Sequence, residues 1–480
     1  MDYRPQAPLC KHLVMSAERA THATRSRALS LYLTMTSTSE VPKHHGLLFH
    51  PHLTFIQKII SFLIDYFLDL KNLGLSRLGS ETCNIILGKA RERTCGGDAT
   101  NKKALKQWSD ASACPLAESK GSLPFRENIL HDWNIVDETA VLPGALSAVK
   151  DRKGVEVLVR FPSSLLTNEV EEKGTILDRS ECLEVDFDKI EWKTFSPDVP
   201  LLIQFHGGGF CIGGNDEQSL IIDTARIVQN APSSSSPNVI TVSVNYGLAP
   251  EDPFPIGIMD ALSVVDYFLK DSTPRDGIHI SGLSAGANIA LVAGFEGFRR
   301  FPGKIISIQA QSPLVDPSGD SMSYYMNQKA YPSPTWLRWC WRIYLGLEHH
   351  EPLQTNPQDK QTLTSVLRED SNHSSWKKWR IDNTSEALHR LVNPLLGIPE
   401  GLDVNASRKN PTILLRYNKG DPLHDDGKYC EDTLRAKAGT NAKIFVQSGL
   451  HCDVAGPYDM KEPGEFWKIW SDVVFNNGTV

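Results

Sequence analysis

The 480-residue sequence lacks several features that would point to particular classes of protein. It has no excess of positive charge, because 50 Lys and Arg residues stand against 57 Asp and Glu residues and the formal net charge is -7. This balance argues against nucleic acid as a partner. None of the nine cysteines forms a C-x-x-C pair, so we expect no structural zinc site. No internal repeat is evident, which argues against a repeat architecture.

The sequence also lacks an uncharged apolar run of the ~18 residues that a membrane-spanning helix needs. Residues 53–70 come nearest to one, but Lys58, Asp65 and Asp69 interrupt them. Their apolar positions recur at helical spacing. We interpret this segment as an amphipathic helix that packs on the protein, with contact to a membrane surface as the alternative.

Residues 1–45 contain no apolar core of a signal peptide, although they are basic and rich in Ser and Thr. Such a composition loosely matches a targeting peptide. A disordered tail is the plainer interpretation, and a true start at Met15 or Met35 is a third. The compartment therefore stays open between the cytoplasm, a membrane surface and an organelle.

From residue 150 onward, short apolar runs alternate with segments of helical spacing. We expect strands at residues 155–161, 201–205, 239–244, 278–281, 305–309, 412–417 and 444–447. Segments with helical spacing lie between them, at residues 256–269 and 285–298. This alternation predicts an α/β fold with a mostly parallel central sheet and helices on both faces.

The same pattern suggests how the chain is divided. We assign residues 150–475 to the sheet domain and interpret the polar segment 168–199 as an inserted loop. Residues 313–394 interrupt the alternation, first with many aromatic residues and then with a strongly polar stretch. We expect this segment to form a helical cap. Residues 46–125 are interpreted as an N-terminal helical extension and a loosely ordered linker that contribute to the cap.

A candidate nucleophile lies in the sequence G-x-S-x-G at residues 282–286. The motif is weak alone, but here an expected strand precedes it and an expected helix follows, which is the setting of a nucleophile elbow. The elbow is a sharp turn whose flanking glycines avoid collisions with neighbouring backbone. We therefore predict that Ser284 is the nucleophile, at a helix N-terminus where backbone N–H groups favour negative charge.

A serine hydroxyl is a poor nucleophile near neutral pH and needs a base and an orienting acid. In elbow-containing folds the chain order is Ser, then Asp or Glu, then His. Asp421 follows the expected strand 412–417, and His451 follows the expected strand 444–447. Both therefore fall at the same edge of the sheet as the nucleophile. Asp425 and Asp426 are competing candidates for the acid.

A run of three glycines follows the expected strand 201–205. Backbone N–H groups in such a run can approach a negatively charged oxygen closely, as in the oxyanion hole of esterases. We therefore predict an oxyanion hole built from Gly207, Gly208, Gly209 and the residue after the nucleophile, Ala285.

Four blocks in this order resemble the hormone-sensitive-lipase family of α/β-hydrolases, which includes carboxylesterases and arylacetamide deacetylases. They are HGGGF at residues 206–210, NYGLAPE at 245–251, GLSAGAN at 282–288 and DPLHDD at 421–426. The resemblance covers residues 150–475. It implies the α/β-hydrolase fold with a helical cap, a triad of Ser284, Asp421 and His451, and hole donors from Gly208, Gly209 and Ala285.

Three residues depart from the family pattern. Leu283 replaces the usual Asp beside the nucleophile, Gly247 replaces the usual Arg of the second block, and Ala287 replaces a Gly in the elbow helix. None of them removes a triad atom. The first two remove charged groups near the site, so they bear on rate and substrate preference more than on reaction type.

We expect hydrolysis of a small, apolar carboxylic ester without a cofactor or metal. Amide hydrolysis or deacetylation uses the same machinery, and so does elimination or lactone chemistry. A catalytically silent receptor is the alternative of another class. Plant gibberellin receptors resemble this family but lack the catalytic histidine, so the presence of His451 argues against that reading.

Overall fold

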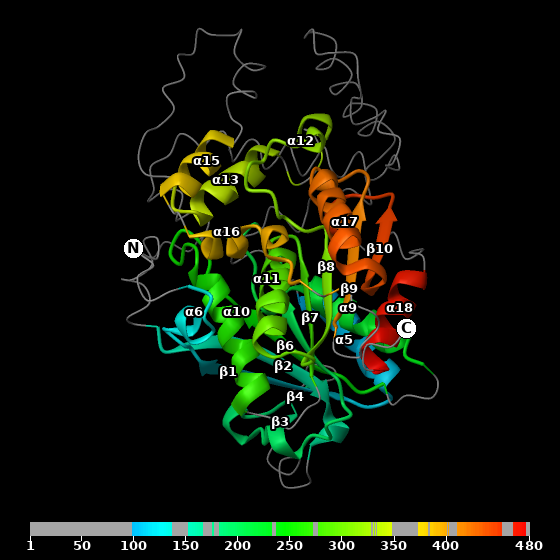
Figure 1. Ribbon diagram of the computed structural model, residues 1–480. Helices are drawn as coiled ribbons and strands as arrows, with labels where there is room; N and C mark the ends of the chain where they lie inside the picture. The colour runs from blue at the N-terminus through cyan, green and yellow to red at the C-terminus, as the bar shows by residue number, and fades with distance from the viewer. Residues whose placement is uncertain are drawn as a thin grey trace, which may run out of the picture. The chain divides into compact units, whose positions relative to one another are not determined.

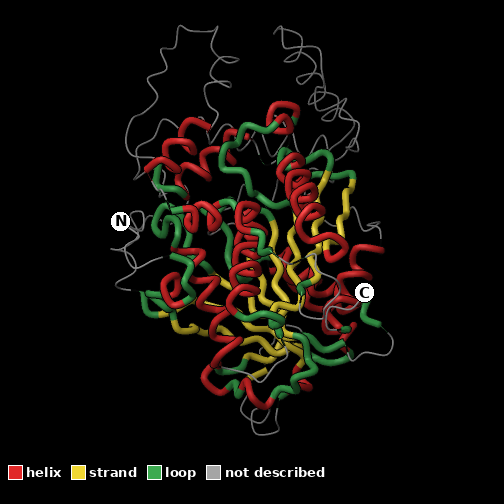
Figure 2. The backbone as a smooth tube through the Cα atoms, in the orientation of Figure 1, coloured by secondary structure: helices red, strands yellow, loops and turns green. Residues whose placement is uncertain are grey.

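The computed structural model describes residues 98–136, 152–166, 175–176, 182–232, 237–271, 277–327, 330, 332, 334–347, 373–382, 385–400, 402, 410–453 and 464–476 (Figures 1 and 2). All of them belong to one unit of the chain, His50–Val480. The predicted amphipathic helix at 53–70 and most of the polar stretch of the expected cap lie outside the described residues.

The described residues form a ten-stranded sheet in the order β10-β9-β8-β7-β5-β6-β2-β1-β4-β3. Its strands are β1 (Leu116–Pro124), β2 (Gly154–Pro162), β3 (Thr175–Ile176), β4 (Cys182–Glu184), β5 (Leu201–Phe205), β6 (Ile240–Asn245), β7 (Ile278–Leu283), β8 (Ile305–Gln311), β9 (Thr412–Asn418) and β10 (Ala442–Gln447). The six strands from β6 to β10 along this order are parallel to their neighbours, whereas β2 pairs antiparallel with both β6 and β1. The predicted mostly parallel sheet is therefore present.

Helices cover both faces of the sheet (Figure 1). The helices are α5 (Asp98–Ser112), α6 (Ile129–Asp132), α9 (Gln218–Gln229), α10 (Ile256–Asp266), α11 (Ala285–Arg300), α12 (Met322–Met326), α13 (Pro334–Tyr344), α15 (His373–Asp382), α16 (Glu386–Val392), α17 (His424–Ala438) and α18 (Gly464–Phe475). Ile203 of β5 packs with residues of α10, α11 and α17 in one core cluster, and its neighbour Leu202 packs with α5, α9 and α18 in another. This alternation is what the two-residue period of a buried strand requires.

The N-terminal part of the described chain differs from the expected linker. Helix α5 packs against α9, and β1 is an inner strand that pairs with β2 over its whole length and with β4 on its other side. The sheet domain therefore begins before residue 150. The sequence of β1, LAESKGSLP, is poor in β-branched residues, and its place in the sheet comes from pairing rather than from propensity.

The polar segment 168–199 also contributes to the sheet. It supplies the short strand β4, which pairs with β1, and the two-residue edge strand β3, so the expected loop is only partly a loop. Very short edge strands limit pairing with other chains.

Helices α12, α13, α15 and α16 all come from residues 313–394, the segment expected to form a cap. Figure 1 shows α12, α13 and α15 at the top of the view, beyond the end of the sheet from which α17 begins. In the part of the chain that the structure describes, no helix is both long and apolar enough to cross a membrane.

Candidate active site

Ser284 occupies a sharp turn between β7 and α11. Its backbone has φ 56° and ψ -119°, a conformation that few residues other than glycine adopt and that is typical of a strained functional turn. Space around the turn is limited, because a Cβ added to Gly286 would lie 2.3 Å from the carbonyl oxygens of Phe205 and His206. The local sequence thus forms the elbow geometry that the G-x-S-x-G motif predicts.

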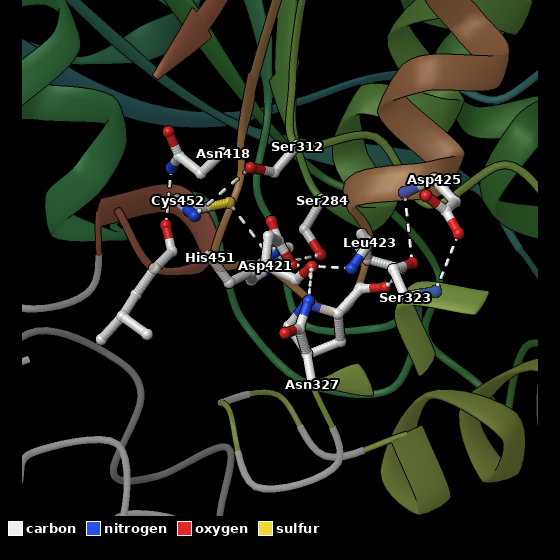
Figure 3. Close-up of polar contacts among 12 residues, drawn as sticks. Ser284, Ser312, Ser323, Asn327, Asn418, Asp421, Leu423, Asp425, His451 and Cys452 are labelled. Carbon is white, nitrogen blue, oxygen red and sulfur yellow. Dashed lines mark hydrogen bonds and ion pairs between the residues drawn. The ribbon is translucent and has the colours of Figure 1, made fainter. Parts of the chain in front are cut away.

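The structure brings Ser284, His451 and Asp421 together in one hydrogen-bonded chain (Figure 3). The Nε2 atom of His451 lies 2.9 Å from the Ser284 Oγ, and its Nδ1 atom lies 2.8 Å from Asp421 Oδ2. All three side chains are buried. The bonds place the donor proton of a neutral imidazole on Nδ1 and leave Nε2 free to accept the serine proton.

Two loops at the ends of β9 and β10 carry the acid and the histidine. The N–H of Leu423 donates to Asp421 Oδ1 at 2.8 Å, so both carboxylate oxygens of Asp421 are engaged. Asn418 Nδ2 donates to the carbonyl of Leu450 at 2.6 Å, which ties the end of β9 to the residue before His451. Because β9 and β10 are parallel neighbours, their following loops meet at one sheet edge.

The competing acids make other contacts. Asp425 Oδ2 accepts the N–H of Ser323, and Asp426 Oδ2 accepts the N–H groups of Val315 and Asp316. Burial raises the pKa of Asp426 well above its usual value, which disfavours a negative charge there. Neither carboxylate is bonded to His451 among the described contacts, so the geometry favours Asp421 as the acid.

Two opposing effects act on the pKa of His451. Burial lowers it, while the charge of Asp421 and the hydrogen bond to it raise it, and the pKa lies well above its ordinary value of 6.5 as a result. The Cys452 side chain raises it further, with its Sγ 3.5 Å from Nε2. The surroundings therefore stabilise the imidazolium that forms when the histidine takes up a proton.

The three glycines after β5 do not have equivalent roles. The N–H of Gly207 donates to Glu217 Oε2 at 3.2 Å, so it is already engaged. Gly208 and Gly209 have φ 105° and 62°, and no hydrogen-bond partner is found for their N–H groups within the described residues. We therefore remove Gly207 from the predicted oxyanion hole and retain Gly208, Gly209 and Ala285.

Helix α13 packs against this glycine loop. A Cβ added to Gly209 would lie 2.5 Å from the Cys340 Sγ, and the ring of Phe210 stacks on Tyr344 with 4.0 Å between centroids. On the other side, Leu283 Cδ1 would lie 2.8 Å from a Cβ at Gly207. Leu283, which replaces the family's Asp, thus packs as an apolar wall against the loop.

His206, which precedes the glycines, is a structural residue rather than a second base. Its ring is fully buried and stacks on Tyr246 at 4.2 Å, and Tyr246 donates its hydroxyl to the His206 carbonyl at 2.9 Å. Burial lowers the pKa of His206 to about 4, so the ring is neutral near pH 7.

The missing arginine at position 247 is matched by a guanidinium from elsewhere in the chain. Arg152 donates from Nε to Asp260 Oδ1 at 2.9 Å and from Nη1 to Asp252 Oδ2 at 2.7 Å, and the N–H of Gly247 donates to Asp260 Oδ2 at 2.7 Å. A Cβ at position 247 would lie 2.7 Å from the Asp252 Cβ. Gly247 and Arg152 therefore fit together around the buried Asp260 carboxylate.

Replacing Arg152 with alanine is expected to lower the free energy of unfolding by about 3–5 kcal/mol, because it leaves the fully buried Asp260 carboxylate without its cation. Urea denaturation followed by circular dichroism measures this change. Lys153→Ala is the matched control, because Lys153 is exposed and its loss should matter little. A destabilisation by Arg152→Ala no larger than that of the control would contradict the assignment.

Several residues at the site were not predicted from the sequence. Glu217 and Asn418 fix the glycine and histidine loops, and Ser323 and Asn327 contact the acid loop. None of these residues lies in a motif. For Cys452, adjacency to His451 was the available signal. Among the described residues, no group of three or more His, Cys, Asp or Glu side chains is arranged to hold a metal ion.

Comparison with known proteins shows which family part of this chain is similar to. A family model for the alpha/beta hydrolase fold matches residues 202–363, which include the glycine loop and the elbow. The predicted α/β-hydrolase fold and the resemblance to the hormone-sensitive-lipase family are confirmed by this match and by the named relatives.

Curated relatives match over parts of their length. The chain is 36% identical to probable carboxylesterase 2 of Arabidopsis thaliana over 99 residues, which are 19% of this chain and 30% of that protein. It is 25% identical to arylacetamide deacetylase of Oryctolagus cuniculus over 278 residues, which are 52% of this chain and 67% of that protein. A thermostable esterase of Pseudomonas putida ECU1011 is 13% identical with a TM-score of 0.49, over 87% of this chain and 97% of that one.

Proposed function

We propose that the chain is a serine esterase that hydrolyses small, apolar carboxylic esters. The observation that carries the proposal is the continuous chain of hydrogen bonds from the Ser284 hydroxyl through the His451 imidazole to the Asp421 carboxylate. Such a chain activates a serine for attack on an acyl carbon. The named relatives include a carboxylesterase, which agrees with this reaction.

In the proposed reaction, Ser284 Oγ attacks the ester carbonyl while His451 Nε2 takes up its proton. The negative charge that forms on the carbonyl oxygen is stabilised by the N–H groups of Gly208, Gly209 and Ala285. His451 then gives its proton to the leaving alkoxide, and an acyl-enzyme remains. Water attacks this ester with the same base, which releases the carboxylic acid. Asp421 holds the imidazole tautomer and stabilises its charged form throughout.

The preference for an apolar substrate is supported by aromatic residues beside the glycine loop. Trp336 Nε1 lies 3.6 Å from the position of a Cβ at Gly209, and Trp336 packs against Trp339 with 4.9 Å between ring centroids. Both indoles are only partly buried. Aromatic walls with few polar groups are typical of pockets for apolar ligands.

Deacetylation of an aromatic amide is a second candidate, and it is favoured by the rabbit relative, which matches over more of its length than the plant relative does. The same triad could release acetate from either substrate. An amide demands more of His451 as a general acid, because the amine leaving group must be protonated as it departs. Comparison of kcat/KM for phenyl acetate and acetanilide would rank the two reactions.

Labelling with a fluorophosphonate probe, followed by peptide mapping, tests the proposal. We expect one labelled peptide that contains Ser284, together with hydrolysis of p-nitrophenyl esters. Absence of both labelling and turnover in a folded chain would overturn the proposal and favour the silent receptor.

A further inference from the structure

Helix α12 is joined to the loop that carries Asp421 by side-chain hydrogen bonds. Asn327 Nδ2, at the end of α12, donates to the carbonyl of Asp421 at 2.9 Å. Ser323 Oγ, one turn earlier, donates to the carbonyl of Pro422 at 2.6 Å. The N–H of Ser323 donates to Asp425 Oδ2 at 2.7 Å, and Ser323 Oγ in turn accepts the N–H of Asp425 at 3.2 Å. We call these contacts of Ser323, Asn327 and Asp425 the α12 clamp.

The clamp acts on backbone groups, whereas the Asp421 carboxylate is used by other partners. Its two oxygens accept from Leu423 N–H and from the His451 ring. Figure 3 shows Asn327 reaching the loop at Asp421 and Ser323 reaching it beside Asp425. The clamp therefore fixes where the loop backbone lies, and that position decides where the carboxylate points.

The loop carbonyls that the clamp binds have few alternative hydrogen-bond partners. Ser323 and Asn327 are 4% and 6% exposed, so a carbonyl that lost either partner would have little water to replace it. Each contact also joins distant parts of the chain: Asn327 and Asp421 are 94 residues apart in sequence. Local structure of the acid loop alone would not provide these bonds.

We infer that α12 is a positioning element of the triad, in which Ser323 and Asn327 hold the catalytic acid in line with His451 from within the segment expected to form the cap. This inference rests on the proposed function. It means that a displacement of α12 would change the rate of the chemical step, and not only access to the site. A shift of a reacting group by about 1 Å can cost on the order of 100-fold in rate.

We expect a substitution in the clamp to change the pH profile of the reaction as well as its rate, because the charge of Asp421 raises the pKa of His451. Other titratable groups that act on His451 are Cys452 and Glu217, and those near Asp421 are Asp426 and Tyr324. The clamp substitutions leave all of these groups in place. The acid limb of the profile is the loss of activity at low pH, where His451 becomes protonated. A change in the pH of this limb would therefore report on how Asp421 is placed.

The test compares Ser323→Ala and Asn327→Leu with Tyr325→Phe, a control on the same helix. The Tyr325 hydroxyl donates to Asp320 in an exposed hydrogen bond. For p-nitrophenyl acetate we expect kcat to fall about 10-fold to 100-fold in the two clamp variants, with KM changed less than about twofold. Their acid limb should move to lower pH, and Tyr325→Phe should match the wild type.

A second measurement does not depend on turnover. In a Ser284→Ala background, NMR titration of His451 should give a lower pKa when either clamp substitution is added. An unchanged His451 pKa and an unchanged acid limb, in variants with native circular dichroism, would overturn the inference. Absence of ester turnover in the wild type would instead contradict the proposed function. The comparison of His451 pKa values by NMR would still decide the role of α12.

Discussion

Replacing Ser284 with alanine is expected to lower kcat for p-nitrophenyl acetate by about 10⁴-fold or more. The loss is large because the triad works as one unit: without Oγ, the base has no proton to take up and no acyl-enzyme forms. The fold should survive, because the substitution removes one buried hydroxyl and leaves the elbow backbone in place. Steady-state kinetics on the purified variant, with its melting temperature measured alongside, gives the result.

Two further variants make this test specific. Ser318→Ala removes a hydroxyl that bonds to Asp316 and to no triad atom, so it should retain wild-type kcat. Cys452 Sγ lies 3.5 Å from the same imidazole nitrogen as the serine, so a thiol could account for residual turnover. The Ser284→Ala/Cys452→Ala double variant decides this. Turnover that remains near wild type in the double variant would show that another group is the nucleophile.

The strands that the sequence predicted best are those buried on both faces. The run 201–205 is apolar apart from one glutamine, and it forms β5 with the predicted bounds. Buried parallel strands have such continuous runs, because both faces pack against helices. β1 could not be found in this way, since most of its residues are polar or glycine and only its pairing with β2 explains its place.

The site shows the same division between local and distant information. Ser284, Asp421 and His451 each follow an expected strand, so their shared edge could be predicted from chain order alone. The hydrogen bond from Gly207 N–H to Glu217 could not be predicted, because it depends on how the loop between these residues, 10 positions apart, folds back. The contacts of α12 and of Arg152 join residues about 100 positions apart, and no sequence spacing encodes them.

Replacing Asp421 with asparagine is expected to lower kcat by about 10⁴-fold and to move the acid limb of the pH profile to lower values. The asparagine amide can donate to Nδ1, which favours the tautomer with its proton on Nε2, and that atom can then no longer accept from Ser284. In the wild type the limb should lie above pH 6.5, because Asp421 raises the pKa of His451 and activity is lost as pH falls through that pKa. Without the charge of Asp421, the pKa of the ring loses its largest raising contribution and burial lowers it.

The comparison with the neighbouring acids decides between assignments. Asp426→Asn removes a carboxyl group that holds the backbone of Val315 and Asp316, so it should reduce stability more than it changes the limb. Asp425→Asn should weaken the α12 clamp and reduce kcat far less than Asp421→Asn does. Measuring kcat/KM from pH 5 to 9 for all three variants separates these effects. A larger loss and a larger limb shift in Asp425→Asn than in Asp421→Asn would transfer the role of the acid to Asp425, and the bond of 2.8 Å between His451 and Asp421 would then have to be a contact of the resting state only.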